Sequence, residues 1–147
     1  MDNDEIITTL NKLIETSKDG EEGFRSCADN ASDPQLKTFF SNRVHTCTAA
    51  VIELQELVRA YGGDPENSSD LGSALHRRWV DIKGLVTGRN DRAVLKECER
   101  GEDVAIASYR SALDKNLPAD VRSVVEKQFH GVLKNHDQVK SLRDQYR

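Results

Sequence analysis

The residues with the clearest chemical potential are carboxylates that fall on otherwise apolar helical faces. At about 100° per residue, Glu21 shares a face with Phe24, and Glu102 shares a face with Cys98, with Glu99 at its edge. A carboxylate that points into a protein interior needs a cation or hydrogen-bond donors, because an unpaired buried charge is costly. The first chemical question is therefore which cation these carboxylates face.

Other polar residues fall on apolar faces elsewhere in the chain. Arg43 lies on a stripe with Cys47, and Gln128 and Asn135 lie on a stripe near the C-terminus. His136 lies beside that last stripe. These residue types supply a fixed positive charge, two amide groups and an imidazole, all of which can bind a carboxylate.

Short connections between antiparallel helices decide which of these residues lie at the same level. We expect Glu21 to be level with Arg43, and Glu99 to face Asn135. A connection that returns the chain to the other end of the molecule then brings all the polar groups to one height. The expected buried polar layer consists of Glu21, Arg43, Glu99, Glu102, Gln128, Asn135 and His136.

One interpretation of such a layer is a di-iron or di-manganese carboxylate site. That site uses a lone glutamate from each of two helices and a Glu-x-x-His motif from each of the other two. Its ligands here would be Glu21, Glu99, Glu102 and His136. The motif is incomplete, because Leu133 stands where a glutamate should precede His136.

The segment that carries Arg43 departs further from the metal pattern. Asn42 stands where the motif needs a glutamate, and His45 faces outward. A guanidinium cannot lose its proton and cannot ligate iron, but it can bind two carboxylates through hydrogen bonds. The residues therefore favour a layer without metal or other cofactor, in which Arg43 pairs with Glu21 and Glu102.

The elements that position these residues are expected to be helices. Asp33 followed by Pro34 is a helix start, and Gly62 with Gly63 is a helix end. Such breaks divide the chain into four long helices over residues 4–29, 34–61, 91–115 and 119–145, with a short helix over 70–86.

Each long segment carries one apolar stripe with the spacing of a helix, which is typical of a bundle. The first and last connections are short, whereas the middle connection is long and contains the short helix. The sequence therefore predicts an all-α, ferritin-like four-helix bundle with a single crossover, formed by one domain over residues 1–147.

Composition narrows the class of protein. The 147 residues include 31% charged residues and carry a net charge of -4, which disfavours nucleic-acid and membrane partners. Three cysteines without a C-x-x-C pair indicate a reducing compartment, and no leader or membrane span is visible. We expect a cytoplasmic protein.

Several stretches give a resemblance to a known family. They are LIETSKDGEEGFRSCA (13–28), ELVRAYGGDPENS (56–68), ALHRRWVDIKGLVTG (74–88), LKECERGEDVA (95–105) and LKNHDQV (133–139). With these motifs the chain resembles a bacterial family of ferritin-like four-helix-bundle proteins, a domain of unknown function. The resemblance covers nearly the whole chain and implies the fold, but it implies no activity.

Three functional hypotheses follow. The first is a non-catalytic bundle that acts through its surfaces, in stress physiology and as a homo-oligomer. The second is a di-iron or di-manganese oxidoreductase or metal-storage protein. The third is a small-ligand pocket at the polar layer, which a cavity lined by Glu102 and His136 would support. Gly20, Gly101 and Gly131 lie near this layer, where they would allow close helix approach or room for water.

Overall fold

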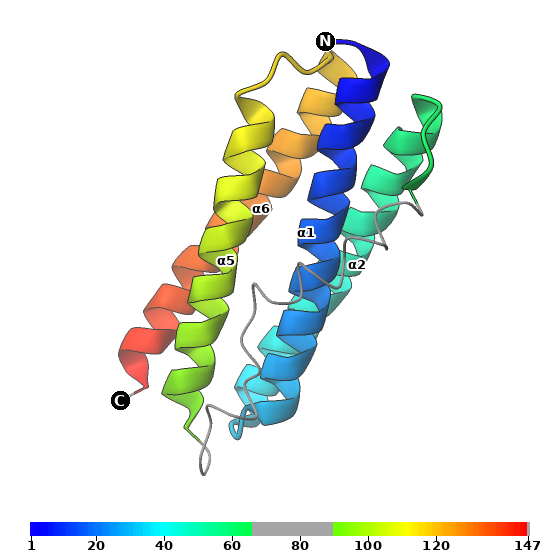
Figure 1. Cartoon of the computed structure of the whole chain (residues 1–147). Helices are drawn as coiled ribbons and strands as arrows, with labels where there is room; N and C mark the ends of the chain where they lie inside the picture. The colour runs from blue at the N-terminus through cyan, green and yellow to red at the C-terminus, as the bar shows by residue number, and fades with distance from the viewer. Residues whose placement is uncertain (66–89, 147) are drawn as a thin grey trace.

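The computed structural model describes residues 1–65 and 90–146, and these residues form four α-helices without any β-strand (Figure 1). The helices are α1 (Asn3–Asn30), α2 (Pro34–Ala60), α5 (Asp91–Leu113) and α6 (Ala119–Gln145). Each predicted long helix is confirmed to within two residues at either end. The predicted short helix over residues 70–86 lies outside the described residues.

Local sequence signals explain where the helices begin and end. Side-chain oxygens of Asp2, Asp33 and Asn90 accept hydrogen bonds from backbone N–H groups in the first turns of α1, α2 and α5. Pro34 occupies the first turn of α2, where its missing N–H costs nothing. Gly62 ends α2 with a φ of 85°, a backbone conformation that favours glycine.

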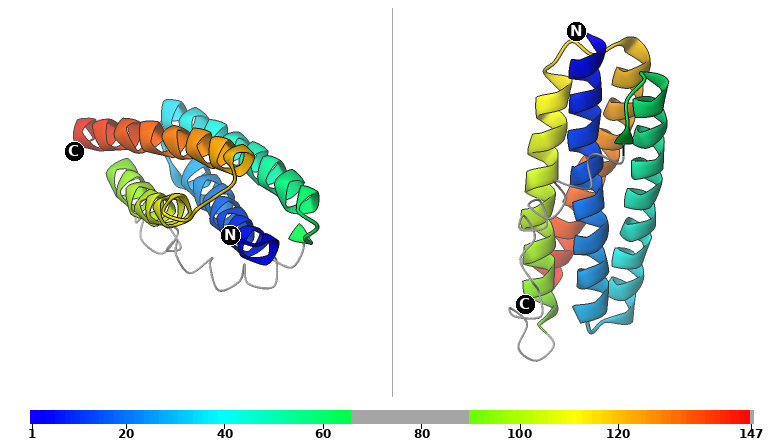
Figure 2. Two further views of the ribbon diagram at one scale, coloured as in Figure 1. Left: turned by 90° about the horizontal axis from the view of Figure 1, so that it is seen from above. Right: turned by 45° about the vertical axis from the view of Figure 1, so that its right-hand side comes forward.

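The chain direction gives the single-crossover topology that the sequence predicted. Helix α1 is antiparallel to α2, and α5 is antiparallel to α6, while α2 and α5 run in the same direction (Figure 1). Figure 2 shows that α1 has α2 on one side and α5 on the other. Among the helix pairs that lie next to each other, α2 and α6 have the sparsest contact.

The apolar core is divided into two clusters at different heights. The first cluster lies toward the start of α1 and includes Leu10, Ile14, Leu54, Val58, Tyr109 and Val121. The second lies toward the end of α1 and includes Phe24, Leu36, Phe40, Leu95, Cys98 and Val139. Small and polar residues occupy the middle of the bundle between them.

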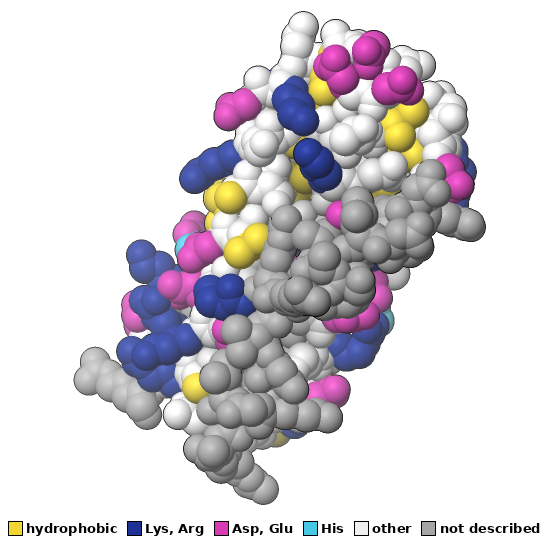
Figure 3. Space-filling view, in the orientation of Figure 1, with side chains coloured by type: hydrophobic (Ala, Val, Ile, Leu, Met, Phe, Trp, Pro, Cys, Tyr) yellow, Lys and Arg dark blue, Asp and Glu magenta, His cyan; other side chains and the backbone are white. Residues whose placement is uncertain are grey.

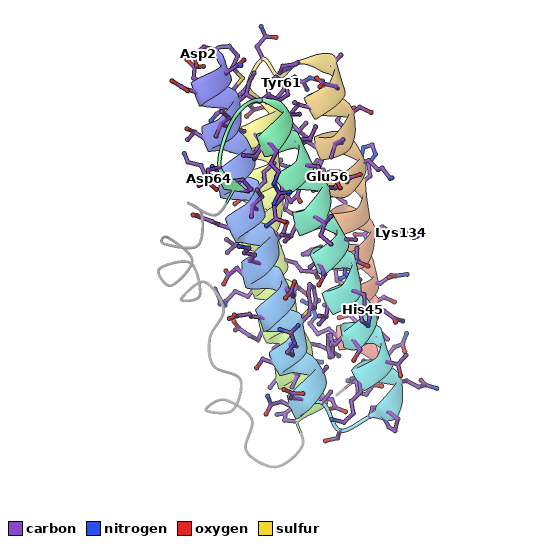
Figure 4. All side chains as sticks on the ribbon, turned by 90° about the vertical axis from the view of Figure 1, so that its right-hand side faces the viewer. Asp2, His45, Glu56, Tyr61, Asp64 and Lys134 are labelled. Carbon is purple, nitrogen blue, oxygen red and sulfur yellow. The ribbon has the colours of Figure 1, made fainter. Side chains whose placement is uncertain are left out.

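At each end of the bundle, hydrogen bonds between residues far apart in the sequence join the helices. At one end, the carboxylate of Asp91 accepts hydrogen bonds from the backbone N–H groups of Ser32 at 2.7 Å and Asp33 at 3.1 Å. At the other end, the hydroxyl of Tyr61 donates a hydrogen bond to Asp120 at 2.8 Å, beside the end of α2 (Figure 4). These contacts connect α1–α2 to α5–α6.

The outer faces of the helices are charged. On the face shown in Figure 3, basic and acidic side chains are intermingled, and hydrophobic side chains are scattered. His45 lies exposed on the outside of α2, as its periodicity predicted (Figure 4). In the described part of the chain, no helix combines the length and the apolar character that a membrane crossing requires.

Candidate functional site: a cavity in the middle of the bundle

A cavity of about 300 Å³ lies between the two apolar clusters and is bounded by all four helices. Much of its wall consists of small residues from each helix: Gly20, Ala50, Gly101, Ala105 and Gly131. These residues leave space that larger side chains would fill. The exposed lining residues Thr46, Ala49 and Lys127 belong to α2 and α6, so the cavity opens along the sparse α2–α6 contact.

Two of the predicted glycines have different structural roles. A methyl group added at Gly20 would lie 3.3 Å from the sulfur of Cys47, so Gly20 allows α1 and α2 to approach closely. A methyl group added at Gly131 would meet no atom within 4 Å. Gly131 therefore contributes open space to the cavity wall, not close packing.

A chain of hydrogen bonds closes one end of the cavity and includes a residue from every helix. The Ser17 hydroxyl lies 3.3 Å from the hydroxyl of Tyr109, which donates to Gln128 at 2.7 Å. Gln128 in turn donates to Glu53 at 2.8 Å. Burial raises the pKa of Tyr109 to about 12, so its phenol stays neutral and keeps its proton for Gln128.

The other end of the cavity contains a buried carboxyl group, Glu102. The side chain of Asn135 donates a hydrogen bond to it at 2.5 Å, and the Cys98 thiol lies 3.9 Å away. Burial raises the pKa of Glu102 to about 7, against the opposing effects of the Asn135 hydrogen bond and of Arg43. Glu102 therefore gains and loses its proton near neutral pH.

Arg43 also lines this end of the cavity, but the predicted ion pairs with Glu21 and Glu102 are wrong. Its guanidinium carbon lies 5.4 Å from the centre of the Phe24 ring, and its Nε is buried without a hydrogen-bond partner. Within the described residues it forms no ion pair. Glu21 instead accepts a hydrogen bond from Thr48 at 2.8 Å, more than one helical turn beyond Arg43.

The same shift in register affects the other pair of helices. Glu102, and not Glu99 as predicted, meets Asn135. Helical side chains lean toward the N-terminus of their own helix. Side chains that meet across an antiparallel pair therefore come from residues that lie further along each helix than the two residues whose backbones are level. A register based on connection lengths alone misses this lean.

The remaining predicted residues lie outside the cavity lining. Glu99 binds Arg143 with oxygen–nitrogen distances of 2.7 and 2.8 Å. The Nε2 of His136 lies 2.8 Å from a carboxylate oxygen of Asp103, which is largely exposed. The seven predicted residues therefore do not form one layer: Arg43, Glu102 and Gln128 line the cavity, Asn135 supports Glu102, and Glu21, Glu99 and His136 have separate partners.

These contacts do not fit the two-metal site that a ferritin-like fold implies. In residues 1–65 and 90–146, no three His, Cys, Asp or Glu side chains are close enough together to hold a metal ion. In the metal-free protein the Cys47 and Cys98 thiols are protonated, because burial raises the pKa of Cys47 to about 11 and that of Cys98 well above its usual range. A metal ion would have to displace these protons to bind the two thiols.

Several polar residues of the interior were not predicted. Ser17, Glu53 and Tyr109 form the closed end of the cavity, and none of them was among the residues predicted for the polar layer. Glu15 and Asp19 are buried on α1. Because α1 packs against both α2 and α5, its buried surface is wider than one stripe, and residues beside the stripe are buried too.

The helix order, the single crossover and the central polar groups together define a ferritin-like four-helix bundle. A solved two-domain protein from Anabaena variabilis, which contains DJ-1/ThiJ/PfpI-like and ferritin-like domains, matches this fold with a TM-score of 0.83 at 14% identity. The match covers 99% of this chain and 40% of that chain, so the chain spans less than half of that protein.

The chain belongs to the DUF2383 family, a domain of unknown function, whose model matches residues 5–115. The resemblance seen in the sequence is thereby confirmed for the family, and the motif at residues 133–139 lies outside the matched range. No curated protein matches the sequence.

Proposed function

We propose that this ferritin-like bundle is a non-catalytic protein that binds a small organic molecule in its central cavity, in place of a metal centre. The observation that carries the proposal is the cavity of about 300 Å³ bounded by all four helices. Ligand sites are typically concave and largely apolar, with a few polar groups that orient the ligand. This cavity has that character, with Arg43 and Glu102 at one end and Tyr109 and Gln128 at the other.

The cavity volume limits the size of the ligand. At roughly 30 Å³ for each water-sized group, a space of this volume accommodates about ten non-hydrogen atoms. Gly131 supports a binding role. Glycine inside a helix is about 1 kcal/mol less favourable than alanine, and at this position the missing side chain only leaves open space in the cavity wall.

Binding can be tested with 1-octanol, an uncharged probe of suitable size. We expect octanol to raise the thermal unfolding temperature of the wild-type protein, because a ligand that binds only the folded state stabilises it. Gly131→Leu should fill the cavity and abolish this stabilisation. Ser141→Leu, at an exposed position on the same helix, is the matched control and should respond as the wild type does. A wild-type protein that does not respond, or a Gly131→Leu variant that responds fully, would contradict the proposal.

The metal alternative is tested by elemental analysis and an absorption spectrum after loading with iron or manganese. Glu102 accepts a hydrogen bond from Asn135, and Glu21, Glu99 and His136 bind other side chains. We therefore expect no stoichiometric metal. Stoichiometric iron with an oxo-bridge absorption band would overturn this part of the proposal.

The surface-directed role in stress physiology, the homo-oligomer and the cytoplasmic location stay predictions from the sequence. On the face shown in Figure 3 the charges are intermingled, and the net charge of the chain is -4. Both observations support the expectation of no nucleic-acid partner, because nucleic acids bind to concentrated positive charge. Light scattering on the purified protein would measure its oligomeric state directly.

A further inference from the structure

We propose that the ligand of this cavity is a small monocarboxylate with an apolar body of about seven carbons, whose carboxylate pairs with Arg43 beside a protonated Glu102. This inference rests on the proposed function and adds the chemical class of the ligand. It makes binding dependent on pH.

The first step is the unpaired guanidinium. Arg43 lines the cavity, its Nε is buried without an acceptor, and its described contact is the ring of Phe24. A buried donor without a partner is costly, and a guanidinium matches the shape and charge of a carboxylate. An incoming carboxylate would supply the acceptor that residues 1–65 and 90–146 do not provide.

The second step is the neighbouring acid, which decides whether an anion can enter. An ionised Glu102 would repel a ligand carboxylate at the same end of the cavity. Because burial raises the pKa of Glu102 to about 7, a neutral form is readily available. That form lets Arg43 keep its full positive charge for the ligand.

The third step is the path of the apolar body. From Arg43 and Glu102 the cavity continues past Ala105 and Gly131 toward Tyr109. The wall between the two ends offers small side chains and little hydrogen bonding, which suits an alkyl or phenyl group. Octanoate has ten non-hydrogen atoms and matches the volume.

Other groups near Glu102 could also titrate. The titratable and charged groups that act on Glu102 are Arg43 and Cys47 from α2, Cys98 and Asp103 from α5, and His136 from α6. From α1, Asp19 lines the same cavity and Cys27 lies against Cys98. Cys47 and Cys98 stay protonated near neutral pH because burial raises the pKa of each thiol. His136 is the group that must be separated from Glu102 by experiment.

The experiment compares octanoate, 1-octanol and octylamine by calorimetry at pH 6.0 and pH 8.5. At pH 6.0 we expect octanoate to bind at least about tenfold more tightly than octanol, and octylamine to bind most weakly. If octanoate binds only when the carboxyl group of Glu102 is protonated, it should bind about thirtyfold more weakly at pH 8.5. Octanol should change little.

Four variants assign these effects to residues. Arg43→Met, which keeps an apolar contact with Phe24, should lose at least about tenfold more affinity for octanoate than for octanol. Glu102→Gln mimics the protonated acid and should abolish the pH dependence. His136→Gln should retain it. Arg43→Lys replaces Arg43→Met in the experiment if Arg43→Met does not fold. It keeps the positive charge but loses the planar guanidinium that can donate two parallel hydrogen bonds, so it should bind octanoate less tightly than the wild type.

The outcomes separate this inference from the proposed function. Equal binding of octanoate and octanol, or a pH effect that survives in Glu102→Gln, overturns the carboxylate assignment but leaves a binding cavity. Tighter binding of octylamine also overturns it. Failure of all three probes to bind the wild-type protein overturns the proposed function itself.

Discussion

At the scale of single residues, Glu102 makes the stability of the fold depend on pH. Its ordinary pKa of 4.5 is raised to about 7 in the folded protein, mainly by burial. The folded form therefore holds the proton that the unfolded chain releases as pH rises above 4.5. The free energy that Glu102 contributes to folding is therefore fully present below pH 4.5 and is lost as the pH rises to about 7.

Glu102→Gln tests this dependence, because glutamine cannot ionise. We expect the variant to match the wild type at pH 4.5 and to exceed its free energy of unfolding by roughly 3 kcal/mol at pH 8. Urea unfolding at the two pH values measures the difference. Glu99→Gln, in an ion pair with Arg143 nearer the surface, is the control and should not gain stability at pH 8. A Glu102→Gln effect that is equal at both pH values would refute the assignment.

The sequence predicted which single residues point inward better than it predicted their partners. Periodicity placed Glu102, Asn135 and Gln128 on inner faces, because the angle per residue is a local property. The lengths of the connections paired Arg43 with Glu21, but Glu21 accepts a hydrogen bond from Thr48 instead. Pairing depends on side-chain direction and helix crossing, and neither is encoded in the spacing of residues along one helix.

At the scale of helices, glycine is required at one position and dispensable at another. Gly62 has a φ of 85° at the end of α2, so Gly62→Ala should destabilise the protein by about 1 kcal/mol. Gly131→Ala adds a methyl group that meets no atom within 4 Å and should stabilise α6 by about 0.5–1 kcal/mol. Chemical unfolding of both variants measures the contrast. A loss of stability in Gly131→Ala would show that its space is not open.

Helix limits were well predicted because their signals are local. Asp33, Pro34 and Gly62 each mark a boundary within one turn of the chain. The contact of Asp91 with the turn between α1 and α2 could not be predicted, since it joins residues far apart in the sequence. It requires the crossover to be known first.

At the scale of the whole molecule, the bundle has two apolar clusters with a cavity between them. Such an arrangement should make the middle of the helices the first region to open locally, because fewer packed contacts oppose opening there. We expect amide hydrogens of α6 near Gly131 to exchange faster than those near Val121 and Val139. Added octanol should slow exchange near Gly131 most. Uniform exchange along α6 that octanol does not change would contradict this account.

The central claim is that an organic molecule, not a pair of metal ions, occupies the middle of this bundle. The most direct measurement is a crystal structure of the protein grown with octanoate, with anomalous data collected at the iron and manganese edges. We predict continuous organic density from Arg43 past Gly131, with no anomalous peak beside Glu102. Two anomalous peaks between Glu21 and Glu102, or octanoate density outside the cavity, would contradict the claim.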